Sequence, residues 1–213
     1  MERDTLMIGG VEFNSRFILS SGKTGHYTNE LIHSAIDDAG VEMISVALSH
    51  LNEEDNGLKQ APEGIKFLPT TLGARTLDDV IKMAHLSKDR GLGDFIKVEI
   101  LHDLKYELPD NDATVEATRI LTEEGFKVLS YFYPDMVLAE ELVKAGAVAI
   151  MPLASPSGSS KGLQTRDFIA DMIGRFDVPI IVDAGIGRPS QACEAMEIGC
   201  DGIMANTALA TAD

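Results

Sequence analysis

Short apolar segments alternate with helical segments eight times along the 213 residues. This alternation predicts an α/β fold, a (β/α)8 TIM barrel. The apolar segments lack a polar face, as expected for parallel strands that are covered on both sides. The length also suits one barrel, so we expect residues 1–213 to form a single domain.

The N-terminal half supplies a hairpin and the first four strands. Residues 6–13 alternate around Gly9-Gly10, which is typical of a hairpin turn. Asn29 suits the start of the first helix and Gly40 its end. Runs of β-branched and apolar residues predict the strands, and apolar residues at helical spacing predict the helices. The strands are expected at 17–20, 43–47, 66–69 and 95–100, and the helices at 29–39 and 76–89.

The C-terminal half repeats the same pattern. Pro189 suits the first turn of the last full helix, because a helix start needs no N–H there. Six residues follow Thr207, so we expect the closing C-terminal helix to be missing or truncated, and the uncovered edge favours a homo-oligomer. The strands are expected at 127–131, 148–151, 179–183 and 202–205, and the helices at 111–124, 135–146, 165–174 and 189–198.

An open Rossmann-type sheet is the competing architecture. Its support is the glycine-containing turn at 185–190, which follows a strand and opens a helix. That turn ends in serine instead of glycine or alanine and lies late in the chain, whereas the dinucleotide-binding turn follows a first strand. The barrel is therefore the favoured prediction.

The composition excludes several classes of function. The net charge of −16 disfavours nucleic acid and anionic membrane surfaces as partners. No apolar run approaches the roughly 18 residues of a membrane span, and no segment resembles a signal peptide. The two cysteines, Cys193 and Cys200, lack the spacing of a metal site or a disulfide framework. We expect a cytoplasmic protein.

The strand at 95–100 carries two charges that a buried strand does not normally hold. Side chains alternate along a strand, so Phe95, Lys97 and Glu99 share one face. A buried ammonium and carboxylate are costly unless they are paired or used. One interpretation is a structural ion pair. The other is a desolvated amine with a lowered pKa, which condenses with a carbonyl group beside a carboxylate that moves protons.

The remaining polar residues fall at the ends of the last strands, where barrel active sites gather. Asp183 ends one strand, either as a turn cap or as a second acid/base facing Lys97. The loops around Gly158 and Gly185, with Asn206 and Thr207, suit a phosphate, although the glycines could serve turns alone. Together these residues predict imine chemistry on a phosphorylated carbonyl compound.

From residue 6 to residue 212 the sequence resembles the thiazole synthase family of thiamin biosynthesis. Four motifs carry the resemblance. They are Phe-Ile-Lys-Val-Glu-Ile at 95–100, Gly-Leu-Gln-Thr-Arg-Asp at 162–167, Val-Asp-Ala-Gly-Ile-Gly at 182–187 and Ala-Asn-Thr-Ala at 205–208.

The resemblance implies a transferase that forms thiazole phosphate. Its substrates would be 1-deoxy-D-xylulose 5-phosphate, dehydroglycine from a separate enzyme, and sulfur from the thiocarboxylate of a small sulfur-carrier protein. Lys97 would form the imine, with Glu99 and Asp183 as acid/base groups. The resemblance implies no metal or redox cofactor on this chain. The implied substrate-phosphate contacts are Gly158, Ala184, Gly185, Asn206 and Thr207.

Three segments depart from the family pattern. Thr70 and Leu72 stand where asparagine and a small residue are expected. Residues 130–133 replace a proline-tyrosine-cysteine-like run. The loop 154–161 is unlike the family's common form and carries an extra lysine, Lys161. Two alternatives follow: another phosphosugar barrel with a lysine imine, such as an aldolase, or a diverged relative that binds the carrier or a phosphosugar without turnover.

Overall fold

The computed structural model describes residues 4–20, 29–48, 64–101, 105 and 108–210. Its strands are β1 (Leu6–Ile8), β2 (Val11–Phe13), β3 (Phe17–Ser20), β4 (Met43–Ala47), β5 (Lys66–Thr70), β6 (Phe95–Val98), β7 (Lys127–Phe132), β8 (Ala149–Pro152), β9 (Ile181–Val182) and β10 (Gly202–Ala205). Its helices are α1 (Asn29–Asp37), α3 (Leu77–Asp89), α4 (Asn111–Glu123), α5 (Met136–Lys144), α6 (Arg166–Met172), α7 (Pro189–Glu197) and α8 (Thr207–Ala210).

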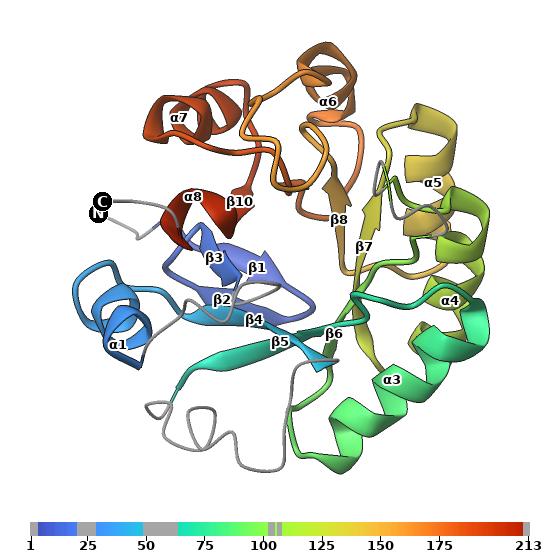
Figure 1. Ribbon diagram of the computed structural model, residues 1–213. Helices are drawn as coiled ribbons and strands as arrows, with labels where there is room; N and C mark the ends of the chain where they lie inside the picture. The colour runs from blue at the N-terminus through green and yellow to red at the C-terminus, as the bar shows by residue number, and fades with distance from the viewer. Residues whose placement is uncertain (1–3, 21–28, 49–63, 102–104, 106–107, 211–213) are drawn as a thin grey trace.

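Eight parallel strands form one sheet in the order β8-β7-β6-β5-β4-β3-β10-β9. Single parallel bridges from Ile150 to Ile180 and from Leu153 to Asp183 join β8 to β9, so the two ends of the sheet meet. Helices lie around the outside of the ring (Figure 1). The predicted barrel is confirmed, and an open Rossmann-type sheet is excluded because its strands would not return to the first edge.

The predicted elements agree with the structure except at their ends. β9 spans Ile181–Val182 instead of 179–183, because Pro179 has no N–H for the ladder and its neighbours form single bridges. β6 ends at Val98 instead of residue 100, because a threonine side chain rather than a neighbouring strand binds the backbone of Glu99. After β10 the described residues continue as the short helix α8.

Local capping explains where three helices begin. Thr76 and Asp79 form a reciprocal capping box at α3. Asp110 accepts the backbone N–H of Ala113 at α4, and Asp135 does the same for the first turn of α5. Each side chain satisfies an N–H that has no partner within its helix, so these starts are encoded locally.

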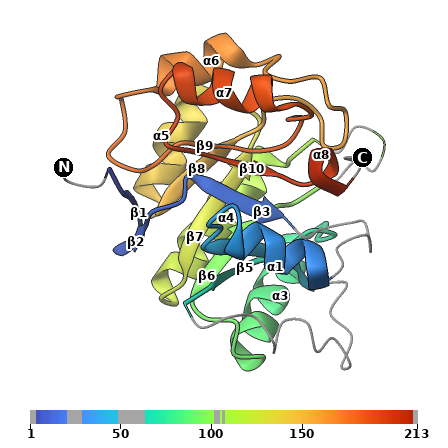
Figure 2. The same ribbon diagram turned by 90° about the vertical axis from the view of Figure 1, so that its left-hand side faces the viewer.

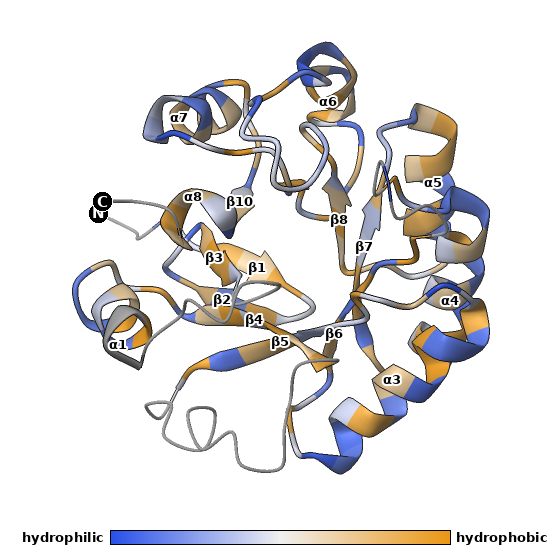
Figure 3. Cartoon of the chain, in the orientation of Figure 1, coloured by the Kyte–Doolittle hydropathy of each residue, from blue (hydrophilic) through white to orange (hydrophobic). Residues whose placement is uncertain are grey.

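The core has two layers because side chains alternate along each strand. Inside the barrel, residues such as Leu68, Phe95 and Leu129 pack together. Outside it, residues such as Ile96 and Val128 pack against the helices. The helices turn apolar stripes to the sheet and polar stripes outward (Figure 3).

The hairpin β1–β2 covers one end of the barrel. Its Leu6, Ile8 and Phe13 side chains belong to the interior cluster. The hairpin and α8 lie at opposite ends of the molecule in the side view (Figure 2). The hairpin thus seals the N-terminal ends of the strands, and the C-terminal ends remain for a pocket. Among the described helices, none has the length and apolarity that crossing a membrane requires.

Candidate active site

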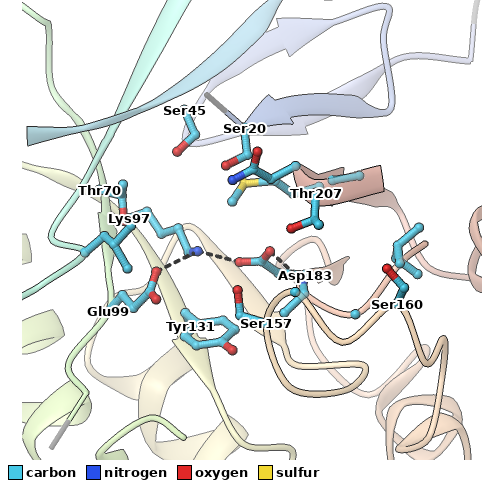
Figure 4. Close-up of a pocket in the computed structure, with 18 residues that line it drawn as sticks. Ser20, Ser45, Thr70, Lys97, Glu99, Tyr131, Ser157, Ser160, Asp183 and Thr207 are labelled. Atoms are coloured by element: carbon cyan, nitrogen blue, oxygen red, sulfur yellow. Dashed lines mark hydrogen bonds and ion pairs between the residues drawn. The ribbon is translucent and has the colours of Figure 1, made fainter. Parts of the chain in front are cut away.

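A polar pocket opens at the C-terminal ends of the barrel strands (Figure 4). It contains all eight site residues expected from the sequence: Lys97, Glu99, Asp183, Gly158, Ala184, Gly185, Asn206 and Thr207. Ten further residues line it: Ser20, Ser45, Thr70, Leu72, Tyr131, Ser157, Ser160, Ile186, Met204 and Ala205. The barrel therefore brings together residues that are far apart in the sequence.

Strand pairing places Lys97 on the interior face of β6. Lys97 lies in register with Thr70 of β5 and with Leu129 of β7. Glu99 follows two residues later on the same face, as the alternation predicts. Thr71 holds it there, because the Thr71 hydroxyl donates to the Glu99 carbonyl oxygen and accepts the Glu99 backbone N–H, both at 2.9 Å. The two charged side chains thus stand on fixed backbone.

Asp183 is held by the contact that closes the barrel. Its backbone N–H donates to the carbonyl oxygen of Pro152 at 3.1 Å, and its carbonyl oxygen accepts the N–H of Ala154 at 2.9 Å. Its carboxylate oxygen Oδ1 accepts the N–H of Ala184 at 2.6 Å. The expected turn cap is therefore present at Oδ1, and Oδ2 faces Lys97.

Lys97, Glu99 and Asp183 form a buried ion triad. The Lys97 Nζ atom lies 3.0 Å from Glu99 Oε2 and 2.5 Å from Asp183 Oδ2. The second contact is an ion pair by distance, without the angles of a hydrogen bond. Each of the three residues is no more than 6% exposed. Figure 4 shows the carboxylates on opposite sides of the amine, so the triad carries a net charge of −1 when all three groups are ionised.

The triad reverses one expectation from the sequence. Burial disfavours the charged amine and lowers the Lys97 pKa. The charges of Asp183 and then Glu99, together with the hydrogen bond to Glu99, act in the opposite direction and prevail, so the Lys97 pKa lies above its ordinary value of 10.5. The predicted free amine is therefore wrong for this arrangement. The raised pKa favours the ammonium form of Lys97, which would have to lose a proton before it could act as a nucleophile.

Tyr131 adds an aromatic face to the triad. The Lys97 Nζ atom lies 4.6 Å from the centroid of the Tyr131 ring, and the residue is 1% exposed. Sequence reasoning missed this residue as a part of the site. The alternation that identified Lys97 would have found it, because Tyr131 lies two residues beyond the inward Leu129 on the same strand.

Thr70, the last residue of β5, and Thr71, which follows it, have different roles. Thr71 is fully buried and bound to the Glu99 backbone, whereas Thr70 lines the pocket and is 4% exposed. Among the described residues, the Thr70 hydroxyl has no hydrogen-bond partner. A buried hydroxyl without a partner is unfavourable by about 1–3 kcal/mol. Thr70 therefore leaves an unsatisfied polar group on the strand next to Lys97.

The opposite wall of the pocket is made of backbone. Gly185 has φ +76°, and a Cβ atom there would lie 1.9 Å from Ser155 Oγ. Gly158 has φ +74°. Among the described residues, the backbone N–H groups of Gly158 and Gly185 have no hydrogen-bond partner. The N–H of Ala184 is already used by Asp183, so two amides of this wall remain for a ligand.

The departures from the family pattern divide into two groups. Thr70 and Leu72 line the pocket. In the segment 130–133 Tyr131 points inward, whereas Ser130 bonds Thr118 of α4. Lys161 is exposed and does not line the pocket. Ser157 and Ser160 of the loop 154–161 also line the pocket, so all three departing segments reach it.

Across the part of the chain that the structure describes, no group of three or more His, Cys, Asp or Glu residues is placed to hold a metal ion. The polar groups of the pocket are instead one ammonium, two carboxylates, several hydroxyls and backbone amides. Such a set can bind an anion at the amides and transfer protons at the carboxylates.

Comparison with known proteins finds a family and named relatives for this chain. A family model described as "Thiazole biosynthesis protein ThiG" matches residues 7–213. A protein from Clostridium beijerinckii named thiazole synthase is 54% identical over 100% of this chain and 82% of its own length. Another of that name, from Fusobacterium nucleatum, is 52% identical over 99% of this chain and 82% of its own length.

A solved structure is also similar. It is the crystal structure of the Amycolatopsis orientalis BexX/CysO complex, with a TM-score of 0.84 and 28% identity. The similarity covers 98% of this chain and 86% of the chain in that structure.

Proposed function

The chain belongs to the ThiG family of thiazole synthases in thiamine biosynthesis, and from this premise we propose that Lys97 forms an imine with the ketone of 1-deoxy-D-xylulose 5-phosphate. The observation that supports the proposal is the buried triad. A lysine amine and two carboxylates meet in one pocket at the C-terminal ends of the strands. A structural ion pair alone would not require a second carboxylate or an open pocket beside it.

The raised pKa of Lys97 sets the first step. The ammonium gives a proton to a carboxylate, and Asp183 Oδ2 is the nearer acceptor at 2.5 Å. The resulting amine attacks the ketone carbon. The carboxylate then passes two protons in turn from the nitrogen to the oxygen, the C–O bond breaks, and the oxygen leaves as water. Lys97 then carries a protonated imine. Glu99, 3.0 Å from the nitrogen, is placed to accept a proton from the neighbouring C–H bond.

The substrate phosphate lies against the β8–β10 side in this proposal. The N–H groups of Gly158 and Gly185 support this position, because both residues line the pocket and these N–H groups have no partner among the described residues. Asn206 and Thr207 line the same side. The triad is negative and repels a phosphate, so the anion is best placed at the loop amides, away from the carboxylate oxygens that face Lys97.

Sulfur and the third substrate enter after the imine has formed. Proton transfer by the carboxylates moves the carbonyl along the sugar chain, and sulfur adds at the new electrophilic carbon. We propose a carrier-protein thiocarboxylate as the sulfur source and dehydroglycine as the remaining partner. A related fold occurs in a complex of two proteins, BexX and CysO, which supports a protein partner for this chain as well.

A reconstituted reaction tests the proposal. The purified chain is mixed with deoxyxylulose phosphate, dehydroglycine and a carrier thiocarboxylate, and thiazole phosphate is measured by mass spectrometry. We expect product in the complete mixture and none when any one component is omitted. Cleavage of the phosphosugar without the carrier would indicate an aldolase instead. Binding of the phosphosugar without product in the complete mixture would indicate a non-catalytic relative.

A further inference from the structure

The ring of Tyr131 contacts the reactive nitrogen on a side that neither carboxylate occupies (Figure 4). The 4.6 Å between Lys97 Nζ and the ring centroid lies within the roughly 6 Å over which an aromatic face attracts a cation. Both residues are buried, since Tyr131 is 1% and Lys97 is 4% exposed. Exclusion of water strengthens this attraction. The contact is therefore of the strong, desolvated kind.

The number of N–H donors on Lys97 falls when the imine forms. An ammonium group has three N–H bonds. Condensation replaces two of them by a C=N bond, and the two hydrogens leave with the ketone oxygen as water. The single remaining N–H cannot donate to Glu99 and Asp183 together. The attraction of the ring needs no N–H bond, so it persists while hydrogen bonding declines.

We propose that Tyr131 is a catalytic residue whose aromatic face stabilises the protonated imine on Lys97. This role rests on the proposed imine chemistry. A protonated imine draws electrons from the neighbouring C–H bond far more strongly than a neutral imine does. By holding the positive charge on the nitrogen, the ring keeps the C–H bond acidic and allows the carboxylates to remove its proton at higher pH.

A series of fluorinated side chains tests the role without changing the shape of the site. Tyr131→Phe removes the hydroxyl and keeps the ring. Position 131 then receives 4-fluoro-, 3,4,5-trifluoro- and pentafluorophenylalanine, in which fluorine progressively withdraws charge from the face. Each protein is incubated with deoxyxylulose phosphate in D2O, and exchange at the carbon next to the ketone is followed against pH. Borohydride trapping at Lys97 is measured in parallel.

We expect exchange to decline at high pH, where the imine loses its proton. The pH of this decline should fall with each added degree of fluorination, by about one pH unit across the series. This decline is the alkaline limb of the profile. Tyr131→Phe is expected to keep the limb of the unchanged chain. Pentafluorophenylalanine at Phe132 is the matched control. Phe132 is equally buried but packs outside the barrel with Leu138 and Ala139, so the limb should not move.

Three results would overturn the inference. An unmoved limb with intact trapping removes the role of the ring and leaves the proposed function standing. A shift in Tyr131→Phe as large as that in the fluorinated chains assigns the effect to the hydroxyl. Absence of any sugar adduct on Lys97 in the unchanged chain overturns the proposed function, and this inference with it.

Discussion

The two walls of the pocket are built in different ways. On the β5–β7 side, the polar groups are the side chains of Lys97 and Tyr131, on regular strands, and of Glu99, just after the end of β6. On the β8–β10 side, loop backbone at Gly158 and Gly185 takes their place, and Asp183 is the charged group there. Strand pairing fixes the positions of these side chains closely, which suits groups that transfer protons. Backbone amides in open loops suit an anion, which tolerates several donor arrangements.

Removal of the Lys97 amine should have the largest effect on the strand wall. Lys97→Met keeps a side chain of similar length and leaves two buried carboxylates without their cation. We expect thiazole phosphate formation to fall by at least about 10⁴-fold, and the free energy of unfolding by about 3–5 kcal/mol at neutral pH. Product assay and urea denaturation measure the two effects.

Lys144→Met is the matched control. Lys144 pairs with Glu140 across an exposed surface, so its loss should change stability by no more than about 0.5–1 kcal/mol and leave activity unchanged. Equal losses in the two variants would show that the buried triad does not differ energetically from a surface ion pair.

The loop wall is tested by Gly185→Ala. The new Cβ atom would lie 1.9 Å from Ser155 Oγ at a φ of +76°. Gly174→Ala has nearly the same φ, +72°, but no atom within 4 Å of the new Cβ, so it isolates the backbone cost of about 1–2 kcal/mol. We expect Gly185→Ala to exceed this cost by about 1–3 kcal/mol and to raise the KM for the sugar phosphate. Equal stability losses would contradict the close packing of this loop.

The two threonines at the end of β5 sharpen the comparison within one wall. Thr71→Val removes both hydrogen bonds to the Glu99 backbone, and we expect it to destabilise the chain by about 2–3 kcal/mol. Thr70→Val replaces a buried hydroxyl without a described partner, and we expect it to raise stability by up to about 1 kcal/mol. Thermal or urea unfolding compares them, and the same sign of change in both would refute the distinction.

The smallest expected effect concerns pH. The folded-state pKa of Lys97 lies above its ordinary value of 10.5, so the folded chain binds this proton more tightly than the unfolded chain does. The stabilisation is complete below about pH 10.5 and is lost as the pH rises through the folded value, with a slope of up to about 1.4 kcal/mol per pH unit. Urea denaturation from pH 9 to 11.5 should show a steeper decline for the unchanged chain than for Lys97→Met. Parallel declines would contradict the raised pKa.

The same contrast explains what the sequence could and could not predict. The alternation of side chains along a strand placed Lys97 and Glu99 on one inward face. The predicted barrel placed Asp183 at the same end of the strands. The state of the amine depended on the sum of two opposing effects, burial and two nearby charges, which requires distances. A turn cap by Asp183 was one of the predicted roles, but its use of the Ala184 N–H in particular was not predicted, because loop dihedral angles do not follow from periodicity.

Three predictions concern the whole protein and not its pocket. The homo-oligomer, the cytoplasmic location and the single domain of residues 1–213 stay predictions, because they depend on surfaces and surroundings instead of the pocket. The family assignment and the barrel do not depend on them.

Chemical trapping of the imine examines the reactive amine most directly. The chain is incubated with 1-deoxy-D-xylulose 5-phosphate, reduced with borohydride and digested, and the modified peptide is sequenced by mass spectrometry. We predict one sugar phosphate adduct, on Lys97, which disappears in Lys97→Met and persists in Lys144→Met. An adduct on another lysine, or none at any substrate concentration, would contradict the assignment of Lys97 as the nucleophile.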